Sequence, residues 1–571
     1  MTRERRERGQ GKSIHRRRFL KISGAAAAFG ALGPGVAFGG PAGTGGGRPP
    51  NILCIVSDEM APGYLGCYGG EALTPHLDSL ARDGVRFDEA YCVSAVCAPS
   101  RFTILTGLYP GHCTHPGFLS SQPTARPYLI SWNTGITRDT PCIPRLLSEA
   151  GYYTGFVGKY GVPFADSNAE WDIPKFHRED DPDDPEVDRR LRRYHEICVE
   201  RVKRSAGFDY AAGVMPGNVH NPIPELHHHQ FEWITEGALE FLDRAAARGD
   251  PFFLYAATTA VHGPNHVDDL DADPRYTLEG KREEPFTCHP PRRSIPERLR
   301  AAGLPVDVRH VGMTFLDDHV GALLGKLREL GLDGNTLVLF LADHNVEPGK
   351  ATCYQRGVHV PMLMKWTGRV APGTVTQQRV QFVDVVPTLL EAAGLAPPDL
   401  DGRSFLATAT DGSPLPRELL YFEMGVARAI LKDRYKYIAV RYRPDAIARM
   451  KEGRVNVALD WLEQPNQVHS QIAMCYFPDY FQPDQLYDLS ADPYEQRNLS
   501  EDPEHADVLR DLRAALAAEL EQFEHPYDLA VPSFVRSEQY RRLVEKRLAR
   551  GTAGVGWWPD DYQWPPDGAG Q

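Results

Sequence analysis

The chain has 571 residues, 42% of them hydrophobic, which suffices for a large core and excludes a disordered or fibrous protein. Its ten cysteines show no paired spacing, so neither a zinc ribbon nor a disulfide framework is indicated. The net charge is −13, and residues 1–42 carry nine basic and two acidic side chains, so the remaining chain has a net charge of −20. An acidic surface of this kind argues against nucleic acid as a partner and mildly disfavours long polyanions.

Residues 1–42 are typical of a twin-arginine (Tat) signal peptide. The basic run His15-Arg-Arg-Arg-Phe-Leu-Lys21 precedes an Ala/Gly-rich segment over 22–37, which is too short to span a membrane and is interrupted by Pro34. A basic RNA-binding arm is the alternative, but such an arm has no use for the apolar segment. We therefore expect a bacterial protein that the Tat machinery exports to the periplasm, the cell envelope or the medium, with cleavage within 35–42.

Strand and helix patterns alternate from residue 49 to about 410. Strands are predicted at 51–56, 85–91, 155–157, 251–256 and 336–342, and helices at 74–81, 230–244, 313–330 and from 384. This order predicts an α/β fold with a large, mostly parallel sheet between helices, whose functional residues lie beyond the carboxyl ends of the strands. Two polar segments, 163–207 and 263–300, are candidates for a pocket rim, and the charge run Arg178–Asp188 predicts a solvated loop.

The pattern changes after residue 410, where we expect a small α+β subdomain over 411–530. A strand, a turn and a strand are predicted over 428–440, a further strand over 485–489 and an amphipathic helix over 504–523. Residues 531–571 are expected to form a tail packed on the body, because free tryptophans at 557, 558 and 564 would be costly. The predicted division is thus 1–42, 49–410, 411–530 and 531–571.

The motif Cys97-x-Pro99-Ser100-Arg101, followed by Thr106-Gly107, resembles the signature of the type I sulfatases in the alkaline-phosphatase-like superfamily. For the pentapeptide alone, a buried cysteine in a turn is the alternative reading. The resemblance implies that a formylglycine-generating enzyme oxidises Cys97 to formylglycine (3-oxoalanine). One hydroxyl of its hydrate would attack sulfur and the other would expel sulfate, while Arg101 would hold the diol.

Two charged pairs follow predicted strands, Asp58-Glu59 and Asp343-His344, and they resemble the residues that bind calcium in this family together with the residue derived from Cys97. Three carboxylates and one imidazole suit one hard cation such as Ca²⁺ better than zinc. Glu59 departs from the commoner aspartate. For each pair taken singly, surface acids at strand ends are the alternative.

Three further residues resemble the family's substrate-binding groups. Lys159 and Lys350 match the two lysines that bind sulfate, and His262 matches the histidine that contacts substrate or leaving group. The clearest departure is Gly161, which stands where the family element Gly-Lys-x-His has its histidine. We expect Tyr160 to replace the missing imidazole, or the aldehyde to be regenerated differently.

Two other stretches contain polar residues whose roles differ from what their types first suggest. Gln355 stands where the family usually has a glutamate after the tyrosine. His227-His228-His229 predicts a polar stretch leading into the 230–244 helix rather than a metal site, because consecutive residues cannot all face one ion.

The motifs match from Asn51 to about Gly402, and the stretch Leu486–Leu499 resembles the family's closing strand and turn. Several features are similar to the heparan N-sulfatases (sulfamidases). We expect an enzyme that hydrolyses a sulfate ester or N-sulfate of a sugar or another small molecule. Two alternatives stay open: a phosphonate or phosphate monoester hydrolase of the same superfamily, and a non-catalytic protein that binds sulfated ligands with Cys97 unmodified.

Overall fold

The structure, a computed structural model, describes residues 48–122, 129–219, 221–346, 348–442, 473, 476–525 and 527–530. The predicted signal peptide over 1–42 and the predicted tail over 531–571 lie outside these residues. All elements named below belong to the unit that begins at Pro49. No helix in the described part of the chain is long and apolar enough to cross a membrane.

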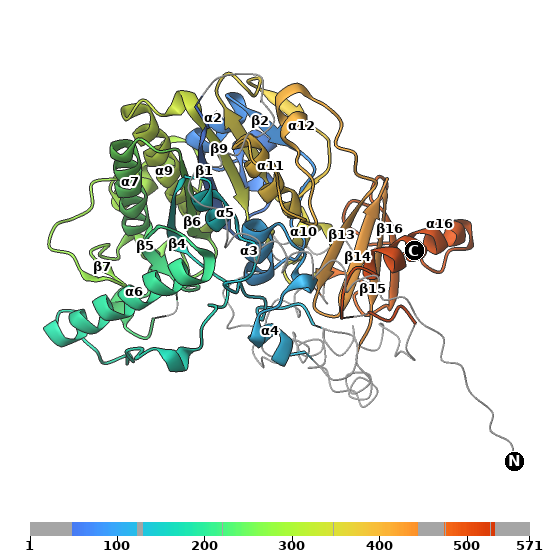
Figure 1. Ribbon diagram of the computed structural model, residues 1–571, viewed down its shortest axis with the longest axis horizontal. Coiled ribbons are helices and arrows are strands. Elements are labelled where there is room, and N and C mark those ends of the chain that lie inside the picture. The colour runs from blue at the N-terminus through green and yellow to red at the C-terminus, as the bar shows by residue number, and fades with distance from the viewer. Residues whose placement is uncertain are drawn as a thin grey trace, which may run out of the picture. The chain divides into compact units, whose positions relative to one another are not determined.

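An eight-stranded mixed sheet forms the centre of this unit (Figure 1). Five neighbouring strands, β9, β1, β6, β4 and β5, run parallel, whereas β10 is antiparallel to both β9 and β2. In spatial order the strands are β11 (Thr374–Thr376), β2 (Val85–Phe87), β10 (Met362–Trp366), β9 (Thr336–Ala342), β1 (Asn51–Asp58), β6 (Phe252–Val261), β4 (Tyr153–Lys159) and β5 (Tyr210–Met215).

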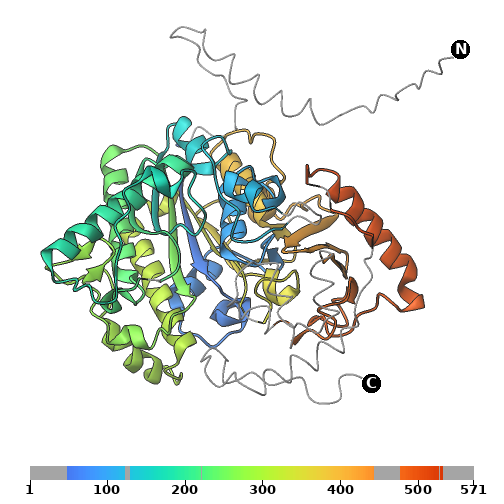
Figure 2. The ribbon, with the colours of Figure 1, turned by 90° about the horizontal axis from the view of Figure 1, so that it is seen from below.

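The central strands are covered on both faces, which explains their nearly continuous apolar sequences. Every residue of β1 and β9 is buried. Helices lie on both faces of the sheet (Figures 1 and 2), and the predicted α/β fold with a mostly parallel sheet is confirmed. The helices of this layer structure are α2 (Pro75–Arg82), α3 (Cys97–Thr106), α5 (Ile143–Glu149), α6 (Pro185–Ala206), α7 (Phe231–Arg248), α8 (Ile295–Ala301), α9 (Val308–Glu329) and α11 (Val385–Ala392).

Two predicted elements differ from the structure. The segment 85–91 is not one strand: β2 joins the large sheet, while β3 (Ala90–Tyr91) pairs separately with β12 (Val380–Gln381). The charge run Arg178–Asp188 is not wholly a loop, because Pro185 starts the 22-residue helix α6. The Asp184 side chain accepts a hydrogen bond from the N–H of Glu186, and Val187 and Leu191 are buried, so capping and an apolar stripe outweigh the charged composition.

The strands and the helix predicted after residue 410 are present, whereas their division from the rest of the chain as a subdomain over 411–530 stays a prediction. Their antiparallel sheet has the order β13 (Leu419–Met424), β14 (Ala427–Lys432), β15 (Tyr435–Val440) and β16 (Asp484–Asp488), and α16 (Ala506–Leu520) packs on β14 and β15 (Figure 1). The buried carboxylate of Glu495 forms an ion pair with Lys436 (3.2 Å) and accepts a hydrogen bond from the N–H of Gln355 (2.6 Å). The predicted boundary at 410 falls within α12 (Leu406–Asp411) and stays a prediction.

Candidate active site

Four of the five adjacent parallel strands bring a polar residue to the same edge of the sheet. Asp58 ends β1, and Asp343 follows β9, which pairs with β1 in register up to Ser57 and Ala342. Lys159 ends β4 and His262 follows β6. Since carboxyl ends of parallel strands meet at one edge, residues far apart in sequence converge there.

Helix α3 supplies two further residues of the predicted site, Cys97 and Arg101. Cys97 is its first residue and Arg101 follows four positions later, so both side chains lie on one face of the helix. The hydroxyl of Ser100 donates to the backbone carbonyl of Asp343, which fixes the helix against the end of β9. Gly107, at φ 70°, ends the helix in the left-handed conformation that glycine adopts readily.

Asp58, Cys97, Asp343 and His344 form a buried cluster whose ligand atoms all lie within 4.8 Å of one another. The Sγ of Cys97 is 3.3 Å from Nε2 of His344 and 3.5 Å from Oδ1 of Asp58. Two carboxylates and an imidazole, joined by an oxygen ligand if Cys97 becomes a hydrated aldehyde, form a donor set that fits a hard cation. The cluster brings together four of the five residues predicted to bind metal.

Charges of opposite sign lie side by side in this cluster, where Lys159 and Arg101 are paired with Asp58 and Asp343. Burial opposes ionisation of Asp58, yet Lys159 and the other neighbouring cations hold the pKa of this carboxyl well below its usual range. Burial would lower the pKa of His344, but Asp343 and Cys97 raise it to about 9. The buried carboxylates thus keep their charge beside the cationic side chains of Lys159 and Arg101, as buried charges need a partner.

Arg101 is held on two sides and has one unused donor. Its Nε donates to Oδ2 of Asp343 (2.9 Å) and one terminal nitrogen donates to the carbonyl of Lys159 (2.9 Å). The other terminal nitrogen is buried, has no hydrogen-bond partner among the described residues and lies 4.0 Å from Oδ1 of Asp58. Arg101 therefore keeps a buried donor nitrogen inside the site.

Lys159 contacts the predicted nucleophile position directly. Its Nζ lies 3.2 Å from the Sγ of Cys97 and also donates to Asp58 and to the Oδ1 of Asn218. The Nδ2 of Asn218 donates to Nε2 of His262 (3.2 Å), whose pKa burial and Lys350 lower to about 3. Asn218 therefore joins Lys159 to a neutral His262, and the sequence analysis did not identify it.

Glu59 contacts Lys350, His262 and Asp343. Its carboxylate accepts a hydrogen bond from Lys350 and is 3.3 Å from Nε2 of His262, and its backbone N–H donates to Asp343 (3.0 Å). Its backbone is left-handed, at φ 61°. The carboxylate thus pairs with Lys350 rather than joining the four-residue cluster, and a metal-binding role for Glu59 stays a prediction.

Tyr160 does not replace the histidine missing at Gly161. Its ring is fully buried and stacks on Phe164 with a centroid distance of 5.2 Å. Successive residues at the end of a strand point to opposite sides, so Tyr160 turns away as Lys159 turns inward. The prediction for Tyr160 was wrong, and Asn218 is the polar group beside Lys159.

The histidine stretch is buried rather than merely polar at His228 and His229. Ligand atoms of His229, His266 and Asp269 lie within 4.8 Å of one another. Several of these groups have hydrogen-bond partners: Nδ1 of His229 bonds Thr259 (2.6 Å) and Nδ1 of His266 bonds Asp269 (3.2 Å). The Nε2 of His266 is buried, lies close to Gly312 of α9 and has no hydrogen-bond partner among the described residues.

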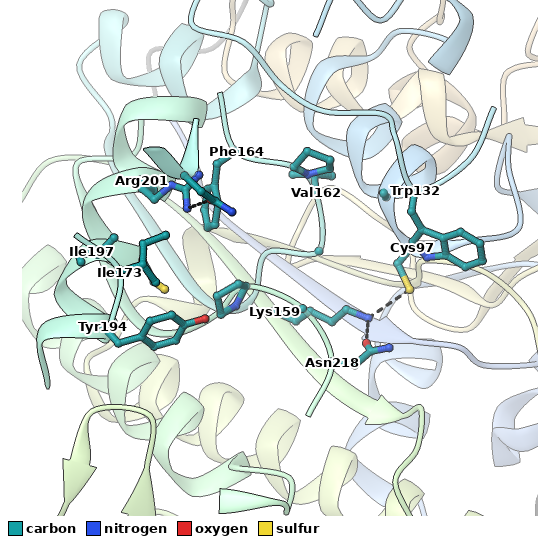
Figure 3. Close-up of a pocket in the computed structure, with 17 residues that line it drawn as sticks. Cys97, Trp132, Lys159, Val162, Phe164, Ile173, Tyr194, Ile197, Arg201 and Asn218 are labelled. Atoms are coloured by element: carbon teal, nitrogen blue, oxygen red, sulfur yellow. Dashed lines mark hydrogen bonds between the residues drawn. The ribbon is translucent and has the colours of Figure 1, made fainter. Parts of the chain in front are cut away.

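A cavity of about 470 Å³ leads away from Cys97 and Lys159 (Figure 3). Its walls come from the loop after β4, from α6, from the segment after β5 and from Trp132. Of the two polar segments predicted as rim, 163–207 lines this cavity, whereas no described residue of 263–300 does. Figure 3 shows Lys159 pointing toward Cys97 while Tyr194, Ile173 and Ile197 lie at the other end.

Comparison with known families agrees with this architecture. Residues 50–395 match the family model described as Sulfatase, and residues 349–448 match that of the C-terminal part of N-sulphoglucosamine sulphohydrolase. The chain belongs to the sulfatase family, and its class of activity is that of a sulfuric ester hydrolase.

Individual relatives are distant in sequence. The chain is 28% identical over 418 residues to N-acetylgalactosamine-6-sulfatase of Rattus norvegicus, covering 68% of this chain and 71% of that protein. It is 27% identical over 494 residues to an ulvan-active sulfatase of Formosa agariphila, covering 82% and 74%.

Solved structures share the fold. A Bacteroides thetaiotaomicron sulfatase from glycosaminoglycan metabolism aligns with a TM-score of 0.54 at 23% identity, over 83% of this chain and 99% of that one. A Pseudoalteromonas sulfatase aligns with a TM-score of 0.51 at 19% identity, over 84% and 92%. At this identity the likeness concerns the fold alone.

Proposed function

We propose that this chain is a formylglycine-dependent, calcium-binding sulfatase that hydrolyses the sulfate ester or N-sulfate of a sugar or another small molecule. The observation that carries the proposal is the position of Cys97: it lies within 3.5 Å of Asp58, His344 and Lys159, at the inner end of a cavity. A nucleophile beside both a cation site and a lysine is what attack on an anionic ester requires.

Asp58, Asp343 and His344 would hold the calcium ion, with Glu59 as a further predicted ligand. Bound there, calcium supplies positive charge to the sulfate oxygens and to the attacking oxygen. Position 97 as hydrated formylglycine supplies the oxygen that attacks sulfur and the second hydroxyl that releases sulfate.

The chain's own side chains divide the other tasks. Lys159 and Lys350 carry the two positive charges that bind the sulfate oxygens. Arg101 holds the diol through its unused terminal nitrogen, because its other donors fix it to Asp343 and Lys159. His262 would contact the substrate or its leaving group, and Asn218 joins its Nε2 to Lys159.

A sugar as substrate agrees with the names of the relatives, which include an N-acetylgalactosamine-6-sulfatase and ulvan-active sulfatases. The proposal includes two partners from the sequence: a formylglycine-generating enzyme that acts on the 97–101 motif, and the Tat machinery that would export the folded protein through residues 15–21.

Sulfate release from 4-nitrophenyl sulfate and from N-sulfoglucosamine tests the proposal, with 4-nitrophenyl phenylphosphonate as the phosphorus counterpart. The protein is co-produced with a formylglycine-generating enzyme, and Cys97→Ala is the matched control. We expect sulfate release that is lost in the variant. Faster turnover of the phosphonate would favour the phosphonate hydrolase, and no turnover by a protein whose Cys97 stays unmodified despite the co-produced enzyme would favour the binding protein.

A further inference from the structure

A second charged group lines the cavity beside Cys97, on the side away from the predicted nucleophile. Lys159 contacts Cys97 at one side of the cavity, and Figure 3 shows Arg201 beside Phe164 at the other. Arg201 comes from helix α6, and only 6% of it is exposed. The cavity volume of about 470 Å³ is that of a small-molecule site, so one ligand can contact both Lys159 and Arg201.

The loop after β4 fixes the guanidinium of Arg201 in this wall. Its Nε donates to Oδ1 of Asp166 (2.7 Å), and one terminal nitrogen donates to the backbone carbonyl of Asp166 (3.0 Å). The other terminal nitrogen donates to Oδ1 of Asn168 (2.8 Å). The guanidinium lies over the ring of Phe164, 4.2 Å from its centroid. Arg201 is thus held in one orientation before any ligand binds, which lowers the entropic cost of a contact with it.

Two N–H groups of Arg201 have no acceptor among the described residues. A guanidinium carries five N–H groups, and the hydrogen bonds to Asp166 and Asn168 use three of them. A donor in a nearly buried place needs an acceptor, either a water molecule or a ligand atom. Because Arg201 lines the cavity, a ligand oxygen there can accept these bonds. The carboxylate of Asp166 already balances the charge of Arg201, so the accepting oxygen needs no charge of its own.

We propose that Arg201 is a specificity-determining residue, which donates hydrogen bonds to an uncharged hydroxyl or carbonyl oxygen on the ring that carries the sulfate. This inference rests on the proposed function for the position of the sulfate at Cys97 and Lys159. A ring without such an oxygen displaces water from the N–H groups of Arg201 and offers no acceptor in return, which weakens its binding. The substrates are therefore sugar sulfates rather than sulfates of plain aryl or hydrocarbon rings.

A purely structural role for Arg201 is the alternative, because its bonds also hold the loop after β4 against α6. Arg190, on the same helix, is the matched control. It pairs with Asp180 (3.0 Å), and its guanidinium lies over the ring of Phe176, 5.6 Å from the centroid, but Arg190 does not line the cavity. Lysine at either position keeps a positive charge beside the aspartate and removes the planar set of N–H donors.

Two pairs of ligands that differ only in the oxygens of the ring test this proposal. One pair is N-sulfoglucosamine and N-cyclohexylsulfamate, and the other is glucose 6-sulfate and cyclohexylmethyl sulfate. Dissociation constants are measured by calorimetry with Ca²⁺ present, on the Cys97→Ala protein, so that the result does not depend on turnover. In at least one pair we expect the sugar to bind more tightly than its oxygen-free counterpart. Tighter binding of the oxygen-free ligand in both pairs would overturn the proposal, whatever the variants of Arg201 do.

The arginine variants assign this preference to a residue. In the pair whose sugar binds more tightly, Arg201→Lys should weaken binding of the sugar by about tenfold and that of the oxygen-free ligand by less than about twofold. Arg190→Lys should change neither dissociation constant. Equal weakening of both ligands by Arg201→Lys would show a structural role only, and no weakening of the sugar would equally overturn the proposal. If none of the four ligands binds, the proposed function itself is wrong, and the inference falls with it.

Discussion

Gly161 and Arg101 lie so close together that a side chain on the glycine has no room. A Cβ on Gly161 would stand 2.7 Å from Cδ of Arg101 and 3.3 Å from Cε of Lys159. Arg101 cannot move aside, because Asp343 and the carbonyl of Lys159 hold it in a fully buried place. The imidazole that the family carries at this position is therefore incompatible with the arginine position in this chain.

Replacing Gly161 by alanine should lower both stability and activity. The backbone at Gly161 has φ 68°, so part of the cost is conformational, of about 1 kcal/mol. Gly151→Ala isolates that part, because Gly151 has φ 89° and no atom within 4 Å of its Cβ position. We expect Gly161→Ala to cost about 1–3 kcal/mol more than Gly151→Ala in urea unfolding. Equal losses of unfolding free energy in the two variants would show that Arg101 moves aside at little cost.

Asn218 should prove to be a positioning residue for Lys159 and His262. Asn218→Ala removes both hydrogen bonds of its amide, so we expect kcat/KM for sulfate release to fall by about 10–100-fold with little change in Tm. Asn221→Ala is the matched control, since that side chain only accepts a bond from the N–H of Ile223. If both variants behave alike, Asn218 has no role in positioning.

The carboxyl edge of the sheet was largely predictable, because Asp58, His262 and Asp343 each follow an obvious apolar strand. Asn218 was not predicted because strand β5, which precedes it, was not recognised. Its sequence, Tyr-Ala-Ala-Gly-Val-Met, has neither a strong alternation of apolar and polar residues nor many β-branched residues. The helical structure of residues 185–206 was not predicted because the charge run Arg178–Asp188 suggested a solvated loop, although Val187 and Leu191 are spaced for a buried face. Which groups pair within the site, such as Glu59 with Lys350, depends on distances in the folded protein, and the spacing of residues along the sequence does not give these distances.

Stability should depend on pH through Asp317. Burial raises the pKa of Asp317 to about 7, although the backbone N–H groups of His76 and Leu77 donate to this carboxylate. A carboxyl with pKa near 3.9 in the unfolded chain thus contributes stability at low pH that is lost as the pH rises through about 7. Relative to Asp317→Asn, the wild type should lose about 2–3 kcal/mol of unfolding free energy between about pH 5 and about pH 8.

Urea titrations of both proteins at the two pH values measure this difference. A stability difference between the wild type and Asp317→Asn that stays constant with pH would show that Asp317 is already ionised throughout this range.

The buried ion pair Lys436–Glu495 should be essential for holding the stretch Leu486–Leu499 against strand β15. Glu495→Gln leaves the charge of Lys436 without its partner inside the protein, at a cost of about 3–5 kcal/mol. The exposed pair Arg204–Glu200 offers the control, and Glu200→Gln should change stability by no more than about 0.5 kcal/mol. Thermal unfolding of the Glu495→Gln and Glu200→Gln variants measures the two effects. A similar, small shift in Tm for both variants would show that the buried pair is not important.

Calcium should stabilise the folded chain through the acidic cluster. At a concentration one hundred times its dissociation constant, a bound ion adds about 2.7 kcal/mol, so Tm should rise on addition of Ca²⁺ and fall on chelation. Asp343→Asn should abolish this response, whereas Asp172→Asn, which alters an exposed carboxylate outside the cluster, should retain it. A calcium response that survives Asp343→Asn would place the ion elsewhere.

If position 97 acts as formylglycine, turnover must follow the chemical state of that residue. Preparations made with increasing amounts of a formylglycine-generating enzyme are digested, and the fraction of aldehyde in the peptide containing residue 97 is measured by mass spectrometry. Sulfate release per molecule should rise in proportion to that fraction and extrapolate to zero for unmodified Cys97. Turnover that is independent of the aldehyde fraction, or absent when the aldehyde is present, would contradict the account.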